Sequence, residues 1–353
     1  MKRLEKLQAE LVARDLDGFL VNNLTNVYYL TGFSGSNATV FVEPDAVTFF
    51  TDSRYTLAAK DVLHPSIRFV ETRLELAEVE KLAEDRGLKR VGFEPTVPYH
   101  YYQELAGRLS EQKLVAEANL VESLRIIKDE SEIAVIQEAC KISDQAFIDA
   151  LDFIKLGKTE LEIANFLDFR MRELGARGLS FDSIVASGPN SAMPHAHPGQ
   201  RKLEAGDTLT LDFGCVFNQY VSDMTRTIYL DHVNDEQAAL HQLVLDANQA
   251  VIDQAQAGML LTDFDQAARS LIDQAGYGPA FSHSIGHGMG LEVHEVPFFR
   301  AGSEDRLQSG MVVTDEPGIY LDGKYGLRIE DDLWIKEGGC QVLTKAPKEL
   351  III

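Results

Sequence analysis

The sequence contains only three cysteines in 353 residues, at positions 140, 215 and 340, and no Cys-x-x-Cys pair. An odd number of widely spaced cysteines argues against a disulfide framework and fits a reducing compartment. The N-terminus also lacks the apolar stretch of a secretory signal peptide, because Lys2 and Arg3 are followed by polar residues such as Glu5 and Gln8. We therefore expect a cytoplasmic protein.

Long hydrophobic runs and an excess of positive charge are also missing. No stretch approaches the roughly 18 consecutive apolar residues of a membrane-spanning helix, so we expect no membrane insertion. Asp and Glu number 55 against 33 Lys and Arg, which gives a net charge of −22. Such a surface repels phosphate backbones and anionic lipids, and no local basic patch offsets it. We therefore expect no binding to nucleic acid.

Several catalytic motifs are absent as well. There is no Gly-x-Ser-x-Gly nucleophile motif and no P-loop, and the zinc motif His-Glu-x-x-His fails because His294-Glu295 meets Phe298 at its last position. The glycines around His287 are too closely spaced for the dinucleotide-binding fingerprint. Cys215 lies in a strand-like run, and we interpret it as core packing rather than as a nucleophile.

The composition, with 45% hydrophobic and 25% charged residues, is that of a globular chain and excludes disorder or a fibrous repeat. Its length favours two domains, which we place at 1–124 and 125–353, with a charge-rich segment at 122–132 near the boundary. Helical patterns near 75–87 and 98–110 alternate with short apolar runs in the first domain, which predicts an α/β domain. The expected strands are 18–21, 26–30, 38–42, 46–51, 68–71 and 90–93.

The second domain combines long helices with long strand-like runs. Apolar periodicity predicts helices over 131–154, 234–256 and 262–275. Thr159 with Glu162 forms a capping box, and Thr262 with Asp265 is expected to open the last helix in the same way. The expected strands are 180–187, 207–217, 219–230, 311–321 and 326–336.

Two acidic residues interrupt apolar strands of this domain, where a desolvated carboxylate needs a partner. Asp212 lies within Leu209–Phe213, and Asp223 lies in the next strand. A two-residue turn at Phe217 and Asn218 would place the two carboxylates directly opposite, about 4.5–5.5 Å apart at Cβ. A cation between them then explains the pair. The alternative is that each is a solvated strand-end Asp, paired with Arg226 or with backbone amides.

The same arrangement recurs near the C-terminus. A three-residue loop at Asp322–Lys324 would place Glu316 opposite Glu330. His287, between Gly286 and Gly288, offers a nitrogen ligand, although a lone His is as often a packed residue. One His with four carboxylates suits two hard or borderline divalent ions such as Mn²⁺.

These residues lie in a series of motifs that resembles the dimetal peptidases of pita-bread fold. The motifs are Leu211-Asp212-Phe213-Gly214, Ser222-Asp223-Met224-Thr225-Arg226-Thr227, Gly286-His287-Gly288, Glu316-Pro317-Gly318-Ile319-Tyr320 and Arg328-Ile329-Glu330-Asp331-Asp332. Within that family the chain is similar to bacterial Xaa-Pro aminopeptidases (aminopeptidase P). Further similarity lies in Thr31–Ser36, Thr51–Tyr55 and the tail Lys345–Leu350.

The resemblance implies a fold and a site. The fold is α/β (α+β), with an N-terminal creatinase-like domain and a C-terminal pita-bread domain that has a curved, mainly antiparallel sheet. The implied metal ligands are Asp212, Asp223, His287, Glu316 and Glu330. The implied catalytic residues are His195, His283, His294 and Glu316, and the implied substrate-binding residues are His195, His294 and Arg328. Ala196-His197 follows His195 where the family usually has Gly, so His197 is an alternative for its role.

The resemblance also implies an activity. We expect hydrolysis of the bond between an N-terminal residue and a following proline, by a water shared between two divalent ions, most simply Mn²⁺, with Co²⁺ or Zn²⁺ as alternatives. The substrates are peptides with proline in the second position, and a homodimer or higher homo-oligomer is expected. Xaa-Pro dipeptidase (prolidase) is the alternative activity. A non-catalytic peptide-binding module on the same fold is a remote one.

Overall fold

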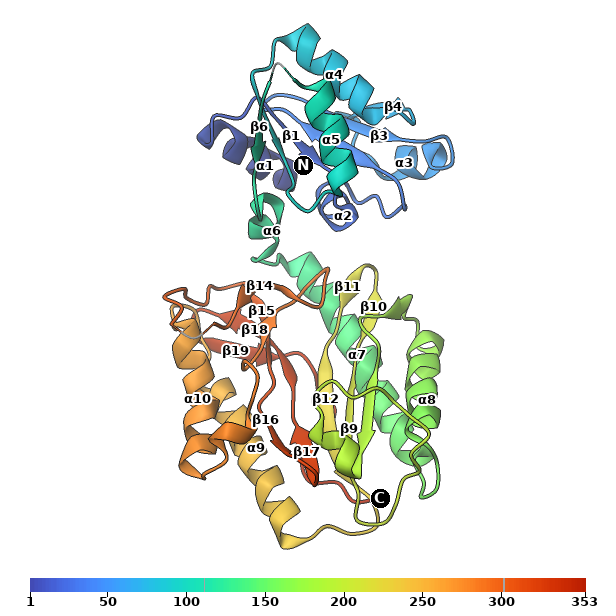
Figure 1. Ribbon diagram of the computed structural model, residues 1–353, viewed down its shortest axis with the longest axis vertical. Helices are drawn as coiled ribbons and strands as arrows, with labels where there is room; N and C mark the ends of the chain where they lie inside the picture. Colours follow the sequence, from blue (N-terminus) through green and yellow to red (C-terminus); the bar gives the residue numbers. More distant parts are fainter. Residues whose placement is uncertain (111, 301) are drawn as a thin grey trace. The chain divides into compact units, whose positions relative to one another are not determined.

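The chain forms two compact units, Met1–Arg125 and Ile126–Ile353, in a computed structural model that describes residues 1–110, 112–300 and 302–353 (Figure 1). Each unit buries its own clusters of apolar side chains. In the described part of the chain, no helix is both long and apolar enough to cross a membrane.

The first unit contains a six-stranded sheet in the order β4-β3-β2-β1-β5-β6. The pairs β1–β2 and β2–β3 are antiparallel, and the other three are parallel. The central strands are fully buried, which explains their continuous runs of Val and Phe. The strands are β1 (Gly18–Val21), β2 (Thr39–Val42), β3 (Val47–Thr51), β4 (Arg68–Glu71), β5 (Arg90–Phe93) and β6 (Lys113–Ala116).

Helices of the first unit form two groups. Helices α4 and α5 contact each other and lie in front of the sheet in Figure 1, whereas α1, α2 and α6 contact one another. The helices are α1 (Lys2–Ala13), α2 (Leu24–Thr31), α3 (Thr56–Val62), α4 (Glu75–Arg86), α5 (Tyr99–Arg108) and α6 (Leu120–Arg125). The predicted strand at 26–30 is wrong, because this segment is α2. The Asn23 side chain accepts from the Thr25 amide at its start, and Gly32 ends it in the left-handed conformation.

The second unit is built from described strands that pair only antiparallel. Its sheets have the orders β11-β10-β7, β12-β9-β8 and β14-β13-β15-β18-β19, and β16 pairs with β17. The strands are β7 (Gly178–Leu179), β8 (Ile184–Ser187), β9 (Thr208–Phe213), β10 (Cys215–Phe217), β11 (Tyr220–Val221), β12 (Met224–Tyr229), β13 (His287–Gly288), β14 (Glu295–Phe298), β15 (Val312–Asp315), β16 (Gly318–Leu321), β17 (Tyr325–Arg328), β18 (Asp331–Lys336) and β19 (Gly339–Val342). The predicted mixed architecture is confirmed.

Four long helices cover the strands of this unit in two pairs. Helices α7 (Glu130–Phe153) and α8 (Glu160–Glu173) share one core with β8, β9 and β12, and α9 (Asp235–Gln254) and α10 (Leu261–Gln274) share a second core with β15 to β18. Figure 1 shows the two helix pairs on opposite flanks, with the strands between them. Cys215 lies in the first of these cores, as predicted.

Of the two helix caps predicted from the sequence, the structure confirms the one at the start of α8 and contradicts the one at the start of α10. Thr159 and Glu162 form the predicted capping box at the start of α8. The predicted cap by Thr262 is wrong, because α10 begins one residue before it without a side-chain cap. Asp265 instead pairs with Arg269 through two hydrogen bonds and accepts the amide of Ile285. It therefore holds the connection that leads to His287.

The first predicted hairpin register is displaced by two residues. The turn is Asn218-Gln219, both with positive φ, so Asp212 lies opposite Thr225 rather than opposite Asp223. Gly214 separates β9 from β10. A Cβ atom at this position would lie 1.9 Å from the Ser222 carbonyl oxygen, so only glycine fits there. Because the displacement is even, it does not change the side of the sheet that a side chain faces.

The second predicted register is confirmed. Gly318 lies opposite Arg328 and Leu321 opposite Tyr325, with a three-residue loop at 322–324. Glu316 lies two residues before the start of β16, and Glu330 lies two residues after the end of β17. Both Glu side chains line the same pocket.

Candidate metal centre

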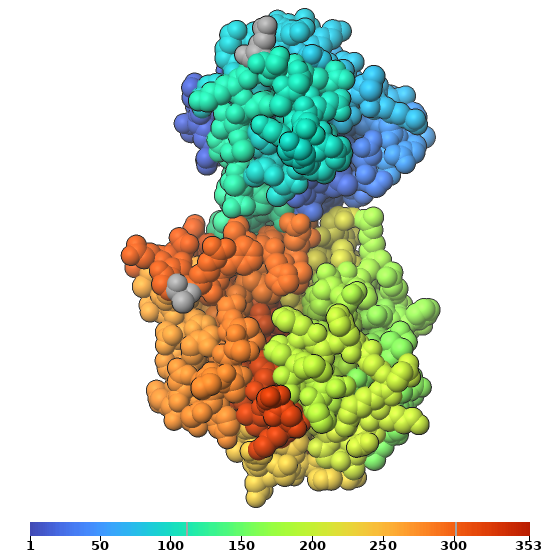
Figure 2. Space-filling view, in the orientation of Figure 1, coloured from blue at the N-terminus to red at the C-terminus, as the bar shows by residue number. Residues whose placement is uncertain are grey.

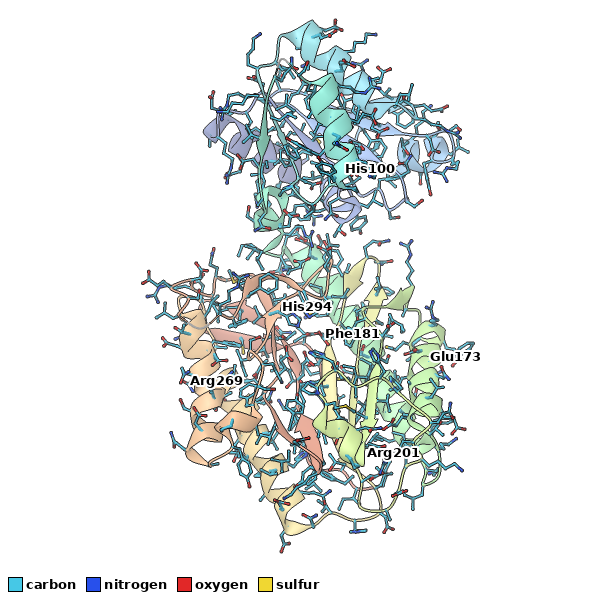
Figure 3. The ribbon with its side chains drawn as sticks, in the orientation of Figure 1. His100, Glu173, Phe181, Arg201, Arg269 and His294 are labelled. Carbon is cyan, nitrogen blue, oxygen red and sulfur yellow. The ribbon has the colours of Figure 1, made fainter. Side chains whose placement is uncertain are left out.

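One pocket of the second unit is lined by all nine predicted site residues. Its volume is about 420 Å³, and segments 181–197, 283–298 and 316–330 supply most of its wall. In Figure 2 the yellow-green and orange segments that contribute to it flank the red C-terminal strands. Phe181 and His294, labelled in Figure 3, both line this pocket and come from different connections of the fold. The nine residues are His195, Asp212, Asp223, His283, His287, His294, Glu316, Arg328 and Glu330.

The acidic residues reach the pocket from strand ends and strand breaks. Asp212 lies near the end of β9, and Asp223 lies between β11 and β12. Glu316 separates β15 from β16, and Glu330 separates β17 from β18. Antiparallel pairing brings the members of each pair together, and the fold brings the two pairs, which lie 93 residues or more apart in the sequence, to one pocket.

His287 presents one ring nitrogen to the carboxylates. Its Nδ1 donates to the carbonyl oxygen of Gly288 at 3.1 Å, which leaves Nε2 as the lone-pair nitrogen. Nε2 lies 3.7 Å from Asp223 Oδ2 and 3.6 Å from Glu316 Oε1. Burial, and the ring of His294 at 4.4 Å, lower the pKa of His287 to about 4, so the imidazole is neutral near pH 7.

The carboxylates of this pocket hold protons more tightly than ordinary acidic side chains. Burial raises the pKa of Glu316 to about 7, against the attraction of Arg328. Burial and neighbouring carboxylates raise the pKa of Asp223 and of Glu330 well above their ordinary values. The pKa of Asp212 is also raised by burial, in spite of its ion pair with Arg328. Removing so many like charges from water is unfavourable unless cations join them.

The guanidinium of Arg328 connects several of these groups. It donates to a carboxylate oxygen of Asp212, to Tyr320 Oη at 2.6 Å and to Thr225 Oγ1 at 3.0 Å. Thr225 Oγ1 in turn donates to Glu330 Oε2 at 2.6 Å. These contacts place Arg328 as a support for Asp212 and, through Thr225, for Glu330.

His283 lies at the end of this network, next to a tyrosine that the sequence reasoning quoted without giving it a role. Tyr320 Oη accepts from Arg328 and donates to His283 Nε2 at 2.9 Å, while His283 Nδ1 donates to the Ser284 carbonyl oxygen at 2.8 Å. Burial, and then the charge of Arg328, lower the pKa of His283 to about 4. Both ring nitrogens of His283 are thus engaged within the protein.

The remaining histidines lie along the open part of the pocket. Burial and the neighbouring His195 lower the pKa of His294. His195 and His197 both line the pocket, so the structure leaves both as candidates for the same role.

Glu160 is a supporting residue that the sequence reasoning missed. It is fully buried at the start of α8, and its carboxylate accepts from the Ser187 amide at 2.7 Å, from Asn190 Nδ2 at 3.0 Å and from the Gly199 amide at 3.1 Å. These bonds hold both ends of the segment that carries His195 and His197. Its position beside a helix cap predicts exposure, so no sequence signal pointed to this role.

The donor set fits divalent metal ions. Ligand atoms of Asp223, His287 and Glu330 lie within 4.8 Å of one another, close enough to hold one ion. Asp212 Oδ1 is buried and has no hydrogen-bond partner in the described part of the chain. Four carboxylates and one neutral imidazole form an oxygen-rich set, which hard and borderline divalent cations prefer.

Comparisons with known proteins agree with this chemistry. The profile of "Metallopeptidase family M24" matches residues 134–337, and that of the "Creatinase/Prolidase N-terminal domain" matches residues 3–127. An Xaa-Pro dipeptidase of Pyrococcus horikoshii is 35% identical over 352 residues, which cover 99% of each chain.

Solved structures show the same relationship. The Xaa-Pro dipeptidase from Bacillus anthracis has a TM-score of 0.97 at 38% identity and covers 100% of this chain and 99% of its own. The X-Pro aminopeptidase from Thermotoga maritima has a TM-score of 0.90 at 36% identity, covering 96% and 98%. The resemblance to pita-bread peptidases, with a dinuclear metal requirement general to the family, is confirmed. The chain is an enzyme, a hydrolase, and belongs to metallopeptidase family M24.

Proposed function

We propose that this enzyme is an Xaa-Pro aminopeptidase, which removes the first residue of a peptide whose second residue is proline. The observation that carries the proposal is one pocket that joins the metal-ligand set to an apolar wall. Phe181, Ile184, Val293 and Phe298 contribute to this wall. The tertiary amide before proline has no N–H, so recognition depends on packing of the ring rather than on a backbone hydrogen bond. The names of the relatives support an Xaa-Pro substrate.

The proposed metal ligands are Asp212, Asp223, His287, Glu316 and Glu330. Two divalent ions held by these groups supply Lewis acidity for the scissile carbonyl and lower the pKa of water at neutral pH. Mn²⁺ is the ion we propose, with Co²⁺ and Zn²⁺ as alternatives, because carboxylate oxygens outnumber the single imidazole.

Other side chains of the pocket handle protons and hold the substrate. Glu316, a carboxylate that lines the pocket, is suited to accept the proton of the attacking water and to return it to the leaving proline nitrogen. Its Oε2 lies 3.8 Å from His283 Nδ1, so His283 and Tyr320 fix the wall beside it. His195 and the imidazole of His294 hydrogen-bond the substrate and the developing oxyanion. Arg328 keeps Asp212 oriented.

The few cationic side chains of the pocket favour a substrate longer than a dipeptide. A dipeptide carries its C-terminal carboxylate directly beside the scissile bond, and burying that carboxylate requires a cationic partner. Arg328 is the single Arg or Lys among the described lining residues, and its donors already bond to Asp212, Tyr320 and Thr225. This favours a peptide that continues beyond proline.

Xaa-Pro dipeptidase is the second candidate. The relatives from Pyrococcus horikoshii and Bacillus anthracis carry this name, and they match the chain at least as well as the aminopeptidase from Thermotoga maritima. A homodimer and a cytoplasmic location also stay predictions.

Removing one proposed ligand charge should abolish metal binding and turnover together. In Glu330→Gln the side-chain shape and the Thr225 hydrogen bond can persist, so the change isolates the charge. We expect Mn²⁺ affinity to fall more than about 100-fold, since a ligand contributes at least as much as its supporting residues. Metal-binding titrations and peptide hydrolysis measure both effects. Glu337→Gln, at an exposed position, is the matched control and should change neither. Retained turnover by Glu330→Gln without added metal would contradict the proposed centre.

Protons should compete with the metal near neutral pH. Acidification protonates Glu316, with a pKa of about 7, and favours the protonated forms of Asp223 and Glu330, whose pKa values are also raised by burial and by neighbouring carboxylates. Mn²⁺ affinity of the metal-free enzyme should therefore fall about tenfold or more for each pH unit below 7. His287, with a pKa of about 4, does not contribute in this range. Calorimetric titration in buffers of different ionisation enthalpy measures the protons released. A constant affinity without proton release between about pH 6 and 8 would refute the competition.

Substrate length is tested with metal-stripped enzyme to which Mn²⁺ is restored. An Xaa-Pro dipeptide and an Xaa-Pro-Yaa-Yaa tetrapeptide compete in one tube, and mass spectrometry follows the products. We expect Mn²⁺-dependent release of the first residue from the tetrapeptide. Cleavage of the dipeptide alone would instead identify a dipeptidase, and a tetrapeptide with Ala in place of Pro controls for proline specificity.

A further inference from the structure

The C-terminal strap, residues 345–353, is attached to the second unit along its whole length. The amides of Lys345 and Ala346 donate to Asp144 Oδ1 at 2.8 and 2.7 Å. Further along, the Tyr229 amide donates to the Ile351 carbonyl oxygen and the Ile353 amide donates to that of Tyr229. The position of the strap is therefore fixed on both sides of Lys348.

Lys348 carries a cation from this strap to two buried polar residues. Its Nζ donates to Asp331 Oδ2 and to Asn248 Oδ1, each at 2.6 Å. Asn248 Nδ2 donates in turn to Asp315 Oδ2 at 3.0 Å. Asp331 and Asn248 are almost completely buried, whereas 19% of the Lys348 side chain is exposed. The ammonium group of Lys348 thus bonds to Asp331 directly and is connected to Asp315 through the side-chain amide of Asn248.

Each of these aspartates is the chain neighbour of a proposed metal ligand. Asp315 precedes Glu316, Asp331 follows Glu330, and Asp315 lies directly opposite Asp331 in the pairing of β15 with β18. Successive side chains of extended backbone point to opposite sides. Accordingly, the two Glu side chains line the pocket and the two Asp side chains do not.

A second cation extends the connection to the backbone. Arg226 is buried and pairs with Asp331 Oδ1 at 2.8 Å, and its Nη1 donates to the Glu330 carbonyl oxygen at 2.6 Å. Asp331 therefore accepts a hydrogen bond from Lys348 on Oδ2 and one from Arg226 on Oδ1. Without these cations, two buried carboxylates directly opposite each other would repel and push their strands apart.

We propose that Lys348 is a positioning residue of the metal centre. By holding Asp331, and Asp315 through Asn248, it fixes the spacing between Glu316 and Glu330. The inference rests on the proposed role of these two glutamates as metal ligands. Lys348 is not among the residues that line the pocket, so we expect it to act on metal affinity through Asp331 and Asn248.

The test compares Lys348→Met with Lys345→Met, which removes the same charge from an exposed position of the same strap. Free Mn²⁺ is measured by electron paramagnetic resonance during titration of metal-free protein, and thermal unfolding of the metal-free forms is recorded in parallel. We expect Mn²⁺ affinity to fall about 10- to 100-fold in Lys348→Met, as for other residues that orient metal ligands, and to stay at the wild-type value in Lys345→Met. If Lys348→Met does not fold, Lys348→Gln, which keeps a hydrogen-bond donor, gives the same comparison.

Two results would overturn the inference in distinguishable ways. A Lys348 variant that unfolds at a lower temperature but binds Mn²⁺ like the wild type shows a structural role only. Wild-type protein that binds no Mn²⁺ refutes the proposed centre itself, and with it the inference.

Discussion

The crowding of carboxylates in the second unit is the constraint on which its other features depend. Asp212, Asp223, Glu316 and Glu330 line one pocket, and one guanidinium, that of Arg328, lies among them. Burying like charges this close costs free energy, which is visible in the raised pKa of all four carboxyl groups. The surrounding structure opposes this cost with Thr225 and with the antiparallel pairing of the strands, and the metal ions that we propose here would reduce it further. We therefore expect metal affinity and folding to be coupled.

Asp315 and Asp331, which are buried but do not line the pocket, are also carboxylates that burial disfavours, and their partners differ from those of the pocket residues. Asp331 is paired with Lys348 and Arg226, whereas Asp315 accepts from Asn248 on Oδ2 and its buried Oδ1 has no hydrogen-bond partner among the described residues. The two faces of one strand pair thus carry acidic groups with different partners. On the rear face the cations of Lys348 and Arg226 neutralise Asp331, and on the front face the buried Asp212 Oδ1 has no hydrogen-bond partner among the described residues.

Much of this arrangement was predictable from the sequence. The strands and helices of the second unit follow their apolar periodicity, and the register of the hairpin from Gly318 to Arg328 follows from its loop length. What the sequence missed are the breaks within strands. Runs predicted as continuous are interrupted at Asp223, Glu316 and Glu330, all of which line the pocket. The hairpin turn lies one residue later than predicted, at Asn218 and Gln219. The cause is local, since these two successive non-glycine residues adopt positive φ.

Supporting residues were harder to predict than ligands. Glu160 carries no motif, and the motifs that contain Tyr320 and Lys348 assign these two residues no role, because only the fold shows their partners. The strand predicted at 26–30 failed because a polar cap, Asn23, and a terminating Gly32 enclose a short helix whose composition is that of a strand.

The central claim is that five residues hold two metal ions in one pocket. Anomalous diffraction at the manganese edge, from crystals of metal-stripped protein soaked in MnCl₂, tests it directly. The account predicts two peaks in the pocket, in contact with Asp212, Asp223, His287, Glu316 and Glu330. A single peak, or manganese bound only outside this pocket, would contradict it.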